Sequence, residues 1–507
     1  MKKLLLFILP ILFVSCDSDN SYKNNRELAV KADALLDAVL QESFSDIIDV
    51  RKDSKTYGYL CALAEEAMFQ SEGRSKNRLP SLYQEKNFPS VYNYYTNSQS
   101  DDATAINKTM IGWLCAMQLS EFCPSKRNDL YKAGYEAGGF SMNSPIYGYS
   151  FKTDPNVARL VASAVYAAMH STSNPDIETM RSEVGGHLYD MTLAELYEEE
   201  SRTHVSNDAF YVDLRKFMAS APGPYAPKYS DRGGINPTFP DEKTSNGCLM
   251  MDLNIYNSII EEMNLPNQRA VQAIADEDGD LRHLFGTDKR NVGGVYNFNA
   301  VFGESTIGET IDPDGKIAAF IFHVQKTGTS ARGILQHASS SAGHYEYGRL
   351  RPGCSEERER KRKSDIDDRL NVLTNFIIED NDGHKACYDD GDIEVPYYDE
   401  NGNWTDDKVQ SAEEYEDMSK DLLYANSYPS GHSSGIWSVA MSMIELYPQK
   451  ADLIMKAAND FAVSRTVSRY HWNSDIIQGR VVGSVMNPVC HAARDYRALL
   501  EAARSER

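Results

Sequence analysis

An internal repeat is the feature that most constrains the fold of this chain of 507 residues. The segment from Tyr470 to Ser484 aligns without a gap with the segment from Tyr149 to Ser163, and the two share Tyr, Asp, Arg and Ser at matching places. Upstream of each segment, Gly112 to Met117 matches Ile436 to Met441 in the same way. Such self-similarity predicts two copies of one structural unit. The alternative is a chance similarity between two helix-rich segments.

The apolar pattern identifies that unit as helical. Apolar residues mostly recur at helical spacing, whereas long alternating runs typical of strands are scarce. One such helical series is Ile436, Ala440, Met443, Ile444 and Tyr447. In both copies the helical pattern stops at a proline, Pro124 or Pro448, which cannot continue a helix. The sequence therefore predicts an all-α protein.

The length of the chain exceeds what one apolar core usually organises, so two domains are expected. Residues 219–247 are dense in Pro, Gly and Ser and are typical of a linker or extended arm. We therefore expect a helical domain over residues 21–218, a linker over 219–247 and a second helical domain over 248–507. An acidic stretch over residues 379–407 is expected to be a solvated surface loop, because it lacks the EF-hand spacing that calcium binding would favour.

The first fifteen residues carry two lysines and then an apolar run too short for a mature membrane span, which indicates an export signal. Cys16 follows at once and resembles the lipid-bearing cysteine of bacterial lipoproteins, and polar residues 17–20 come next as a tether. We expect lipidation of Cys16 and a protein anchored in the cell envelope, facing the periplasm or the outside. The alternative is an ordinary signal peptide with an incidental cysteine.

The net charge of −22 argues against a nucleic-acid partner, whose binding surface would be basic. Any anion site must therefore be built from locally clustered arginines. The cysteines show no CxxC spacing, so a zinc site is not expected. Neither a metal nor a cofactor is predicted.

Three clusters in the second half fit together as one anion site. They are Arg349-Leu350-Arg351-Pro352, Pro429-Ser430-Gly431-His432, and Ser464-Arg465 with His471 and Asp475 six and ten residues after the arginine. Taken singly, each residue is more often structural, for instance as half of an ion pair, a helix cap or a core histidine. Their order and spacing together predict a site for phosphoryl transfer, in which fixed donors must hold a highly charged transition state.

The residue types suit distinct tasks in that chemistry. Arg351 and Arg465 offer planar forks that match phosphate oxygens bidentately. Ser430 can donate its hydroxyl, and Gly431 lets backbone N–H groups at a helix N-terminus approach the phosphate.

Two histidines and a carboxylate are left for the chemical steps. We expect His471 to attack phosphorus, with Asp475, one helical turn further on, orienting its ring. His432 then protonates the leaving alcohol and later deprotonates the attacking water.

This constellation resembles the type-2 phosphatidate phosphatase superfamily and, within it, the bacterial class A non-specific acid phosphatases. The resemblance runs from about residue 246 to residue 496 and extends beyond the motif residues. It implies an all-α bundle with the site at one end, broad phosphomonoester substrates, and inhibition by vanadate. Vanadium-dependent haloperoxidases share the superfamily's pocket and are the alternative enzyme class; a membrane lipid phosphatase is less well supported, because further spans are missing.

One position departs from the family pattern, because the lysine that precedes the first motif is replaced by His344. A histidine also donates to phosphate, but its charge titrates near neutrality, so phosphate affinity is expected to fall as the pH rises. This replacement also leaves open a catalytically decayed, phosphate-binding lipoprotein, although both histidines and both arginines of the site are retained.

In the first half the catalytic residues are absent. Lys108 stands where His432 sits, Ser144 where Arg465 sits and Ser150 where His471 sits. We expect a degenerate, non-catalytic copy that packs against the second half as a pseudo-dimer, with Arg159 bracing its helices.

Overall fold

A computed structural model describes the parts of the chain that build a helical core. The described residues are 14–74, 79, 82, 103–139, 155–172, 174, 177, 179–181, 191–192, 195, 299, 301–324, 388–389, 392–393, 397–398, 404–405, 430–467, 471 and 473–507. Among these residues the fold is helical, as predicted, apart from four strands of two residues each.

The first half begins with the long helix α1 (Val14–Val39), which continues into a π-helical turn (Leu40–Phe44) and leads to a 3-10 turn (Val50–Lys52). Cys16 and the polar residues after it lie in the first turns of α1, and nothing is described of their side chains. None of the described helices is both long and apolar enough to cross a membrane.

Four further helices with defined bounds lie in the described part of the first half. They are α2 (Ser54–Ser71), α3 (Ala103–Phe122), α4 (Arg127–Glu136) and α5 (Pro155–Met169). A 3-10 turn (Pro124–Lys126) joins α3 to α4, and a second one (Ala137–Gly139) follows α4.

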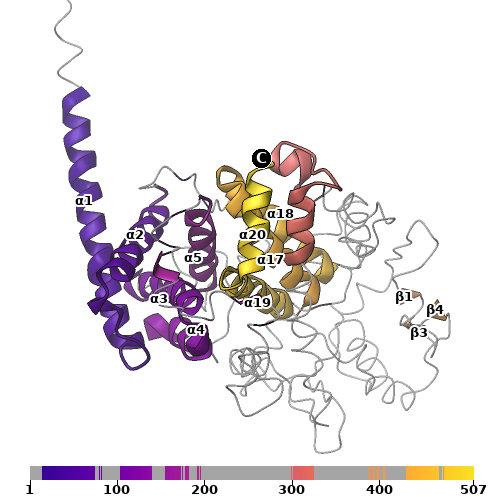
Figure 1. The fold of residues 1–507 in the computed structure, drawn as a ribbon, viewed down its shortest axis with the longest axis horizontal. Helices are drawn as coiled ribbons and strands as arrows, with labels where there is room; N and C mark the ends of the chain where they lie inside the picture. Colours follow the sequence, from indigo (N-terminus) through magenta and orange to yellow (C-terminus); the bar gives the residue numbers. More distant parts are fainter. Residues whose placement is uncertain are drawn as a thin grey trace, which may run out of the picture.

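The second half contains α17 (Gly431–Leu446), α18 (Ala451–Val467), α19 (Asn473–His491) and α20 (Arg494–Arg504). A 3-10 turn (Pro448–Lys450) joins α17 to α18. A π-helical turn (Gly303–Ile307) and helical residues 316–324 pack beside this group (Figure 1). As predicted, α3 and α17 each end two residues before a proline that opens a 3-10 turn.

The acidic stretch over residues 379–407 differs from the expected surface loop. It contains two antiparallel ladders, one between β1 (Tyr388–Asp389) and β2 (Asp392–Ile393), the other between β3 (Tyr397–Tyr398) and β4 (Trp404–Thr405). Each ladder joins two strands that are neighbours in the sequence.

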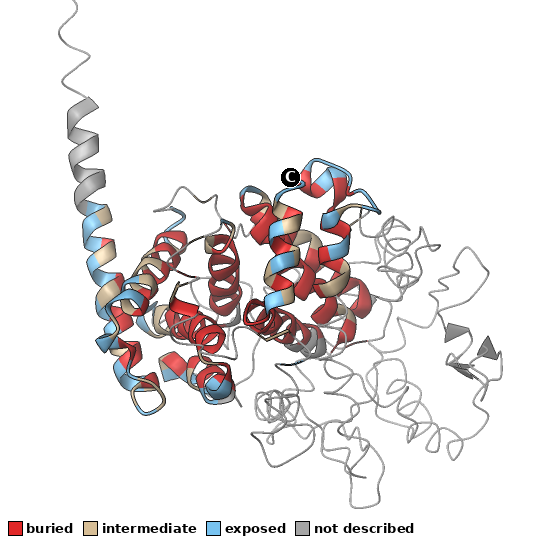
Figure 2. Cartoon of the chain, viewed as in Figure 1, coloured by how far each residue is buried: buried red, intermediate tan, exposed pale blue. Residues whose placement is uncertain are grey.

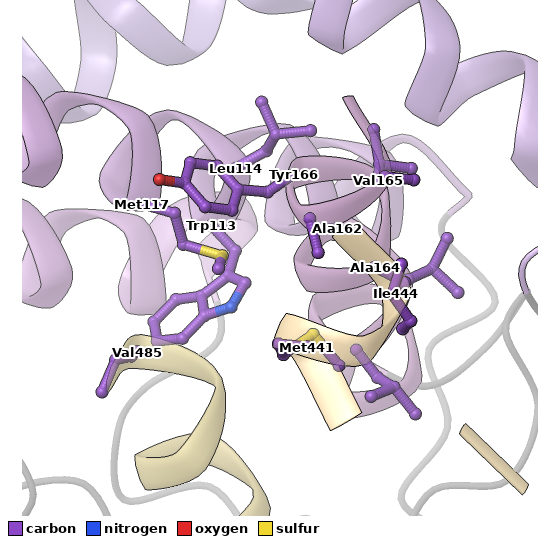
Figure 3. Packing of buried hydrophobic residues seen from close by; sticks show 14 of the residues in the cluster. Trp113, Leu114, Met117, Ala162, Ala164, Val165, Tyr166, Met441, Ile444 and Val485 are labelled. Carbon is purple, nitrogen blue, oxygen red and sulfur yellow. The ribbon is translucent and has the colours of Figure 1, made fainter. Parts of the chain in front are cut away.

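The two halves share one apolar core. Helix α5 packs against α17, and α19 packs against both α3 and α5. Figure 3 shows this meeting place, where Trp113 of the first half lies between Met441 and Val485 of the second. Because burial of apolar area is the main stabilising contribution to folding, each half depends on the other for part of its stability.

Helix α17 lies at the centre of this core. Every residue of α17 except His432 is buried (Figure 2). The reason is that α17 is enclosed by α18 and α19 of its own half and by α5 of the other half. A helix covered on all sides no longer needs a polar face.

Candidate active site

Ser430 and Gly431 form the N-terminus of α17. Ser430 is the N-cap residue, is fully buried, and its hydroxyl oxygen accepts a hydrogen bond from the backbone N–H of Ser433 at 3.3 Å. A capping hydroxyl that accepts this bond still has its own proton to donate. The first turn of a helix also directs N–H groups and the positive end of the helix dipole outward. This end of α17 is therefore suited to bind an anion.

His432 is the one residue of α17 that is partly exposed. Its ring stacks on Phe461 of α18, with the ring centroids 6.1 Å apart and the planes inclined by 30°. The stacking fixes the plane of the ring, and its Nε2 atom is buried although the residue as a whole is partly exposed. A fixed ring suits a group that exchanges protons with a bound ester.

Arg465 lies in the last turn of α18, one turn after Phe461, so both residues occupy the same face of that helix. Its side chain is buried, with 3% exposure. His471, with 2% exposure, follows α18, and its backbone N–H donates to the carbonyl oxygen of Arg465 at 3.2 Å. The structure thus places Arg465 and His471 next to each other, and His432 stacks against the same helix.

Helix α19 brings the third element to this end of the bundle. Asp475 lies in its first turn, although its side chain is outside the described part of the structure. His471 precedes the helix, which starts at Asn473, so the two residues do not share a helical face as their spacing suggested. The hydroxyl of Ser433 donates to the carbonyl oxygen of Ile476 at 2.6 Å and joins the first turns of α17 and α19.

Two glycines allow α19 to approach α17 closely. A Cβ atom at Gly479 would lie 2.5 Å from the carbonyl oxygen of Ser430, and one at Gly483 would lie 2.5 Å from that of Ser434. Such distances are far below van der Waals contact. The close crossing of the two helices therefore requires glycine at both positions.

Two predicted phosphate-binding residues, Arg351 and His344, lie outside the described residues, as does most of the segment that carries them. The structure therefore brings together Ser430, His432, Arg465 and His471 at one end of the bundle and places the backbone of Asp475 beside them. Within the described part of the chain, no group of three or more His, Cys, Asp and Glu side chains could hold a metal ion.

A second charged cluster lies in the core between the halves, and the sequence analysis missed it. In the first half, the Glu121 carboxylate accepts hydrogen bonds from Arg181 and from the hydroxyl of Tyr166. It also lies 3.1 Å from Nε2 of His170, whose Nδ1 is 2.7 Å from the carbonyl oxygen of Tyr166. Both ring nitrogens of His170 thus lie within hydrogen-bond distance of oxygen atoms.

The second half contributes the matching pair. Nε2 of His491 donates to the Glu445 carboxylate at 2.7 Å, and Asn487 donates to the same oxygen at 2.6 Å. Nδ1 of His491 accepts from Arg181 at 2.8 Å, so this imidazole is neutral. Arg504 of α20 lies 3.9 Å from the other oxygen of Glu445. Arg181 therefore connects Glu121 of the first half with His491 of the second.

Burial and charge compete in this buried Glu–His cluster. Burial raises the pKa of the Glu121 carboxyl, but the charges of Arg181 and His170 outweigh it and hold that pKa well below its usual range. The pKa of Glu445 is lowered in the same way, because His491 and the neighbouring charges outweigh burial. Burial lowers the pKa of His491 from 6.5, although Glu445 partly offsets this effect.

The repeat contained the signal for this cluster. Glu121 and Glu445 each stand three residues before the proline that ends their helix, and His170 and His491 each stand seven residues after the last serine of the repeat. Extending the alignment by these few residues would have paired them.

Comparison with known proteins finds a family match within the second half. Residues 345–498 match the sequence model of the PAP2 superfamily. The C-terminal part of the chain therefore carries a PAP2 superfamily domain, which confirms the resemblance predicted from the motifs.

The similar proteins are bacterial acid phosphatases. A segment of 88 residues, 17% of this chain, is 34% identical to 36% of a non-specific acid phosphatase from Providencia stuartii. A segment of 102 residues, 20% of this chain, is 35% identical to 37% of an acid phosphatase from Zymomonas mobilis. The chain thus spans a little over a third of the length of these relatives, and the similarity to them is distant and partial.

Proposed function

We propose that the chain is a metal-independent phosphomonoester hydrolase, an acid phosphatase that acts through a covalent phosphohistidine at His471. The observation that carries the proposal is that His432, at the start of α17, stacks on Phe461 of α18, one turn before buried Arg465, whose carbonyl oxygen accepts from the N–H of buried His471. The PAP2 match and the similarity to acid phosphatases favour the same chemistry.

In the first step, a neutral His471 attacks the phosphorus atom, a P–N bond forms and the bond from phosphorus to the ester oxygen breaks. His432 donates a proton to the departing alcohol. Asp475 orients the ring of His471 through its other nitrogen. The phosphoryl oxygens are held by Arg351, by Arg465 and, at the α17 N-terminus, by Ser430 and Gly431.

In the second step, His432 takes a proton from a water molecule, and the water oxygen attacks phosphorus. The P–N bond breaks, which releases inorganic phosphate and restores neutral His471. His344 adds a donor to the phosphate, and its charge makes binding stronger at acidic pH.

We further propose that the first half is a degenerate copy of the second and that the two form a pseudo-dimer. Matched helices α3 and α17 end in the same proline-initiated turn, and matched Glu–His pairs meet in the core. At the position of His432 the first half has Lys108, whose ammonium group forms an ion pair with Glu42 at 2.7 Å. Arg159 donates to the carbonyl oxygen of Tyr135 at 2.7 Å and so connects α5 to α4, in keeping with a bracing role.

We also propose that Cys16 carries lipid and anchors the protein in the cell envelope. Replacement of Cys16 by serine should abolish incorporation of labelled fatty acid and release the protein from the membrane fraction. Fatty-acid labelling that persists in this variant would contradict the anchor.

The test of the enzymatic proposal is the release of phosphate from p-nitrophenyl phosphate between about pH 4 and pH 8 with EDTA present. The wild type is compared with His471→Ala. EDTA-resistant turnover that is lost in the variant is the expected result. A folded wild type without turnover would contradict the proposal and direct attention to vanadate-dependent peroxidase chemistry.

A further inference from the structure

The first turns of α17 and α19 are joined by a hydrogen bond that the proposed mechanism does not use. The buried hydroxyl of Ser433 donates to the carbonyl oxygen of Ile476 at 2.6 Å. Ser433 directly follows His432, and Ile476 directly follows Asp475. This bond therefore connects the backbone that carries the proton-exchanging histidine to the backbone that carries the orienting carboxylate.

The surroundings of Ser433 leave little freedom to this contact. A Cβ atom on Gly479, one turn after Ile476, would lie 2.7 Å from the Cβ atom of Ser433 and 2.5 Å from the carbonyl oxygen of Ser430. The helices thus touch at this point through backbone and hydroxyl groups. The N–H of Ser433 is also bonded to the hydroxyl oxygen of Ser430, so Ser433 contacts the phosphate-binding cap as well.

We propose that Ser433 is a positioning residue: through Ile476 it fixes the distance between His432 and the pair formed by Asp475 and His471. The inference rests on the proposed function. His432 must reach the leaving oxygen and then the attacking water at the phosphorus atom that His471 attacks. Effective transfer requires reacting atoms about 3–3.5 Å apart, and a misplacement of about 1 Å can slow a reaction about 10²-fold.

Loss of this hydroxyl should affect the rate more than substrate binding. In the proposed mechanism, arginines and the α17 N-terminus hold the phosphate. The hydroxyl of Ser433 is not one of the phosphate donors. We therefore expect Ser433→Ala to lower kcat about 10- to 100-fold and to change KM only slightly. Affinity for orthovanadate, which mimics the geometry of phosphoryl transfer, should fall with kcat, whereas affinity for inorganic phosphate should not.

The chain offers a matched control at the same helix crossing. The hydroxyl of Ser438, which is also buried, lies 3.3 Å from the carbonyl oxygen of Gly483 on α19. Within α17 it donates to the carbonyl oxygen of Ser434 at 2.9 Å. It lies five residues further from the site than Ser433. Ser438→Ala removes a comparable contact and should leave kcat and vanadate affinity near the wild-type values.

A second pair of variants distinguishes the effect of the Ser433 hydroxyl from the effect of side-chain size. Ser433→Thr and Ser433→Val add side chains of nearly equal shape, of which only threonine keeps the hydroxyl. Thr109, at the matching position of the first half, donates at 2.8 Å to the carbonyl oxygen of Ala137 beyond its own helix, so threonine can make such a bond. The threonine variant should retain more turnover than the valine variant, at equal thermal stability.

The experiment measures kcat, KM and vanadate affinity for the full-length wild type and these four variants. Equal rates for Ser433→Thr and Ser433→Val, or an equal loss in Ser433→Ala and Ser438→Ala, would overturn the positioning role while the wild type still turns over. A wild type that binds vanadate without turnover would contradict the proposed hydrolase. The positioning role of Ser433 would then stand if Ser433→Ala binds vanadate more weakly than Ser438→Ala, and it would be overturned if the two affinities are equal. A wild type that neither turns over nor binds vanadate would overturn both.

Discussion

Replacing Glu121 by glutamine should destabilise the whole protein strongly. The side chain of Glu121 is fully buried and balances the charge of Arg181, which is 4% exposed, and it also contacts His170. Glutamine has nearly the same shape but no charge, so it leaves the Arg181 guanidinium buried without its counter-charge. Breaking a buried ion pair from one side typically costs about 3–5 kcal/mol. Because Arg181 also contacts His491 of the second half, we expect one cooperative transition to move to lower urea concentration.

The assay is urea unfolding of the full-length protein, followed by circular dichroism at neutral pH. The matched control is Glu42→Gln, which removes an exposed carboxylate from its 2.7 Å ion pair with Lys108 and should cost less than about 1 kcal/mol. A loss below about 1 kcal/mol for Glu121→Gln, or equal losses for the two variants, would refute the reasoning. Separate unfolding transitions of the two halves would refute the shared core.

Three further predictions concern pH and the helix crossing. His491 has a folded-state pKa below its ordinary 6.5, so the unfolded chain binds its proton more readily and stability falls as the pH drops below about 6.5. Compared with His491→Gln, which does not titrate, the wild type should lose up to about 2 kcal/mol of its free energy of unfolding between pH 6.5 and pH 5, as measured by urea unfolding. A free energy of unfolding that changes with pH equally in both proteins would contradict this prediction. Gly479→Ala and Gly483→Ala should each lower the free energy of unfolding by about 1–3 kcal/mol, because the added Cβ atoms meet the backbone of α17. Only Gly479→Ala should also lower kcat, because Gly479 contacts α17 next to the site. Equal activities of the two variants would contradict a role of this helix crossing in catalysis. His344→Lys should flatten the decline of kcat/KM with rising pH, and an unchanged profile would rule out a role for the charge of His344.

The sequence predicted those features that depend on local chemistry. Proline stops α3 and α17 wherever they pack, and the expected helix N-terminus falls at Gly431. The N-cap role of Ser430, whose hydroxyl accepts from the N–H of Ser433, was not predicted. The grouping of Arg465 and His471 followed from motif spacing alone. The same local logic misplaced His471, because spacing does not reveal that α19 starts two residues later.

Features that depend on the partner half could not be predicted from one segment. Helix α17 is buried on all sides because α5, remote in the chain, covers the face that would otherwise meet water. Glu121 and Glu445 look like surface residues in sequence, yet both are buried because guanidinium and imidazole groups from other elements contact their carboxylates. Only the spacing common to the two aligned segments indicated these pairs, and only the packing of the halves explains them.

The most direct test of the account is to trap the phosphorylated enzyme. Wild type and His471→Ala are mixed with a phosphomonoester, quenched at alkaline pH, where phosphohistidine survives, and digested for mass spectrometry. The account predicts one phosphoryl group on the peptide that contains His471 in the wild type and none in the variant. Turnover without a phosphorylated intermediate, or phosphate attached to His432, would contradict the assignment of His471 as the attacking residue.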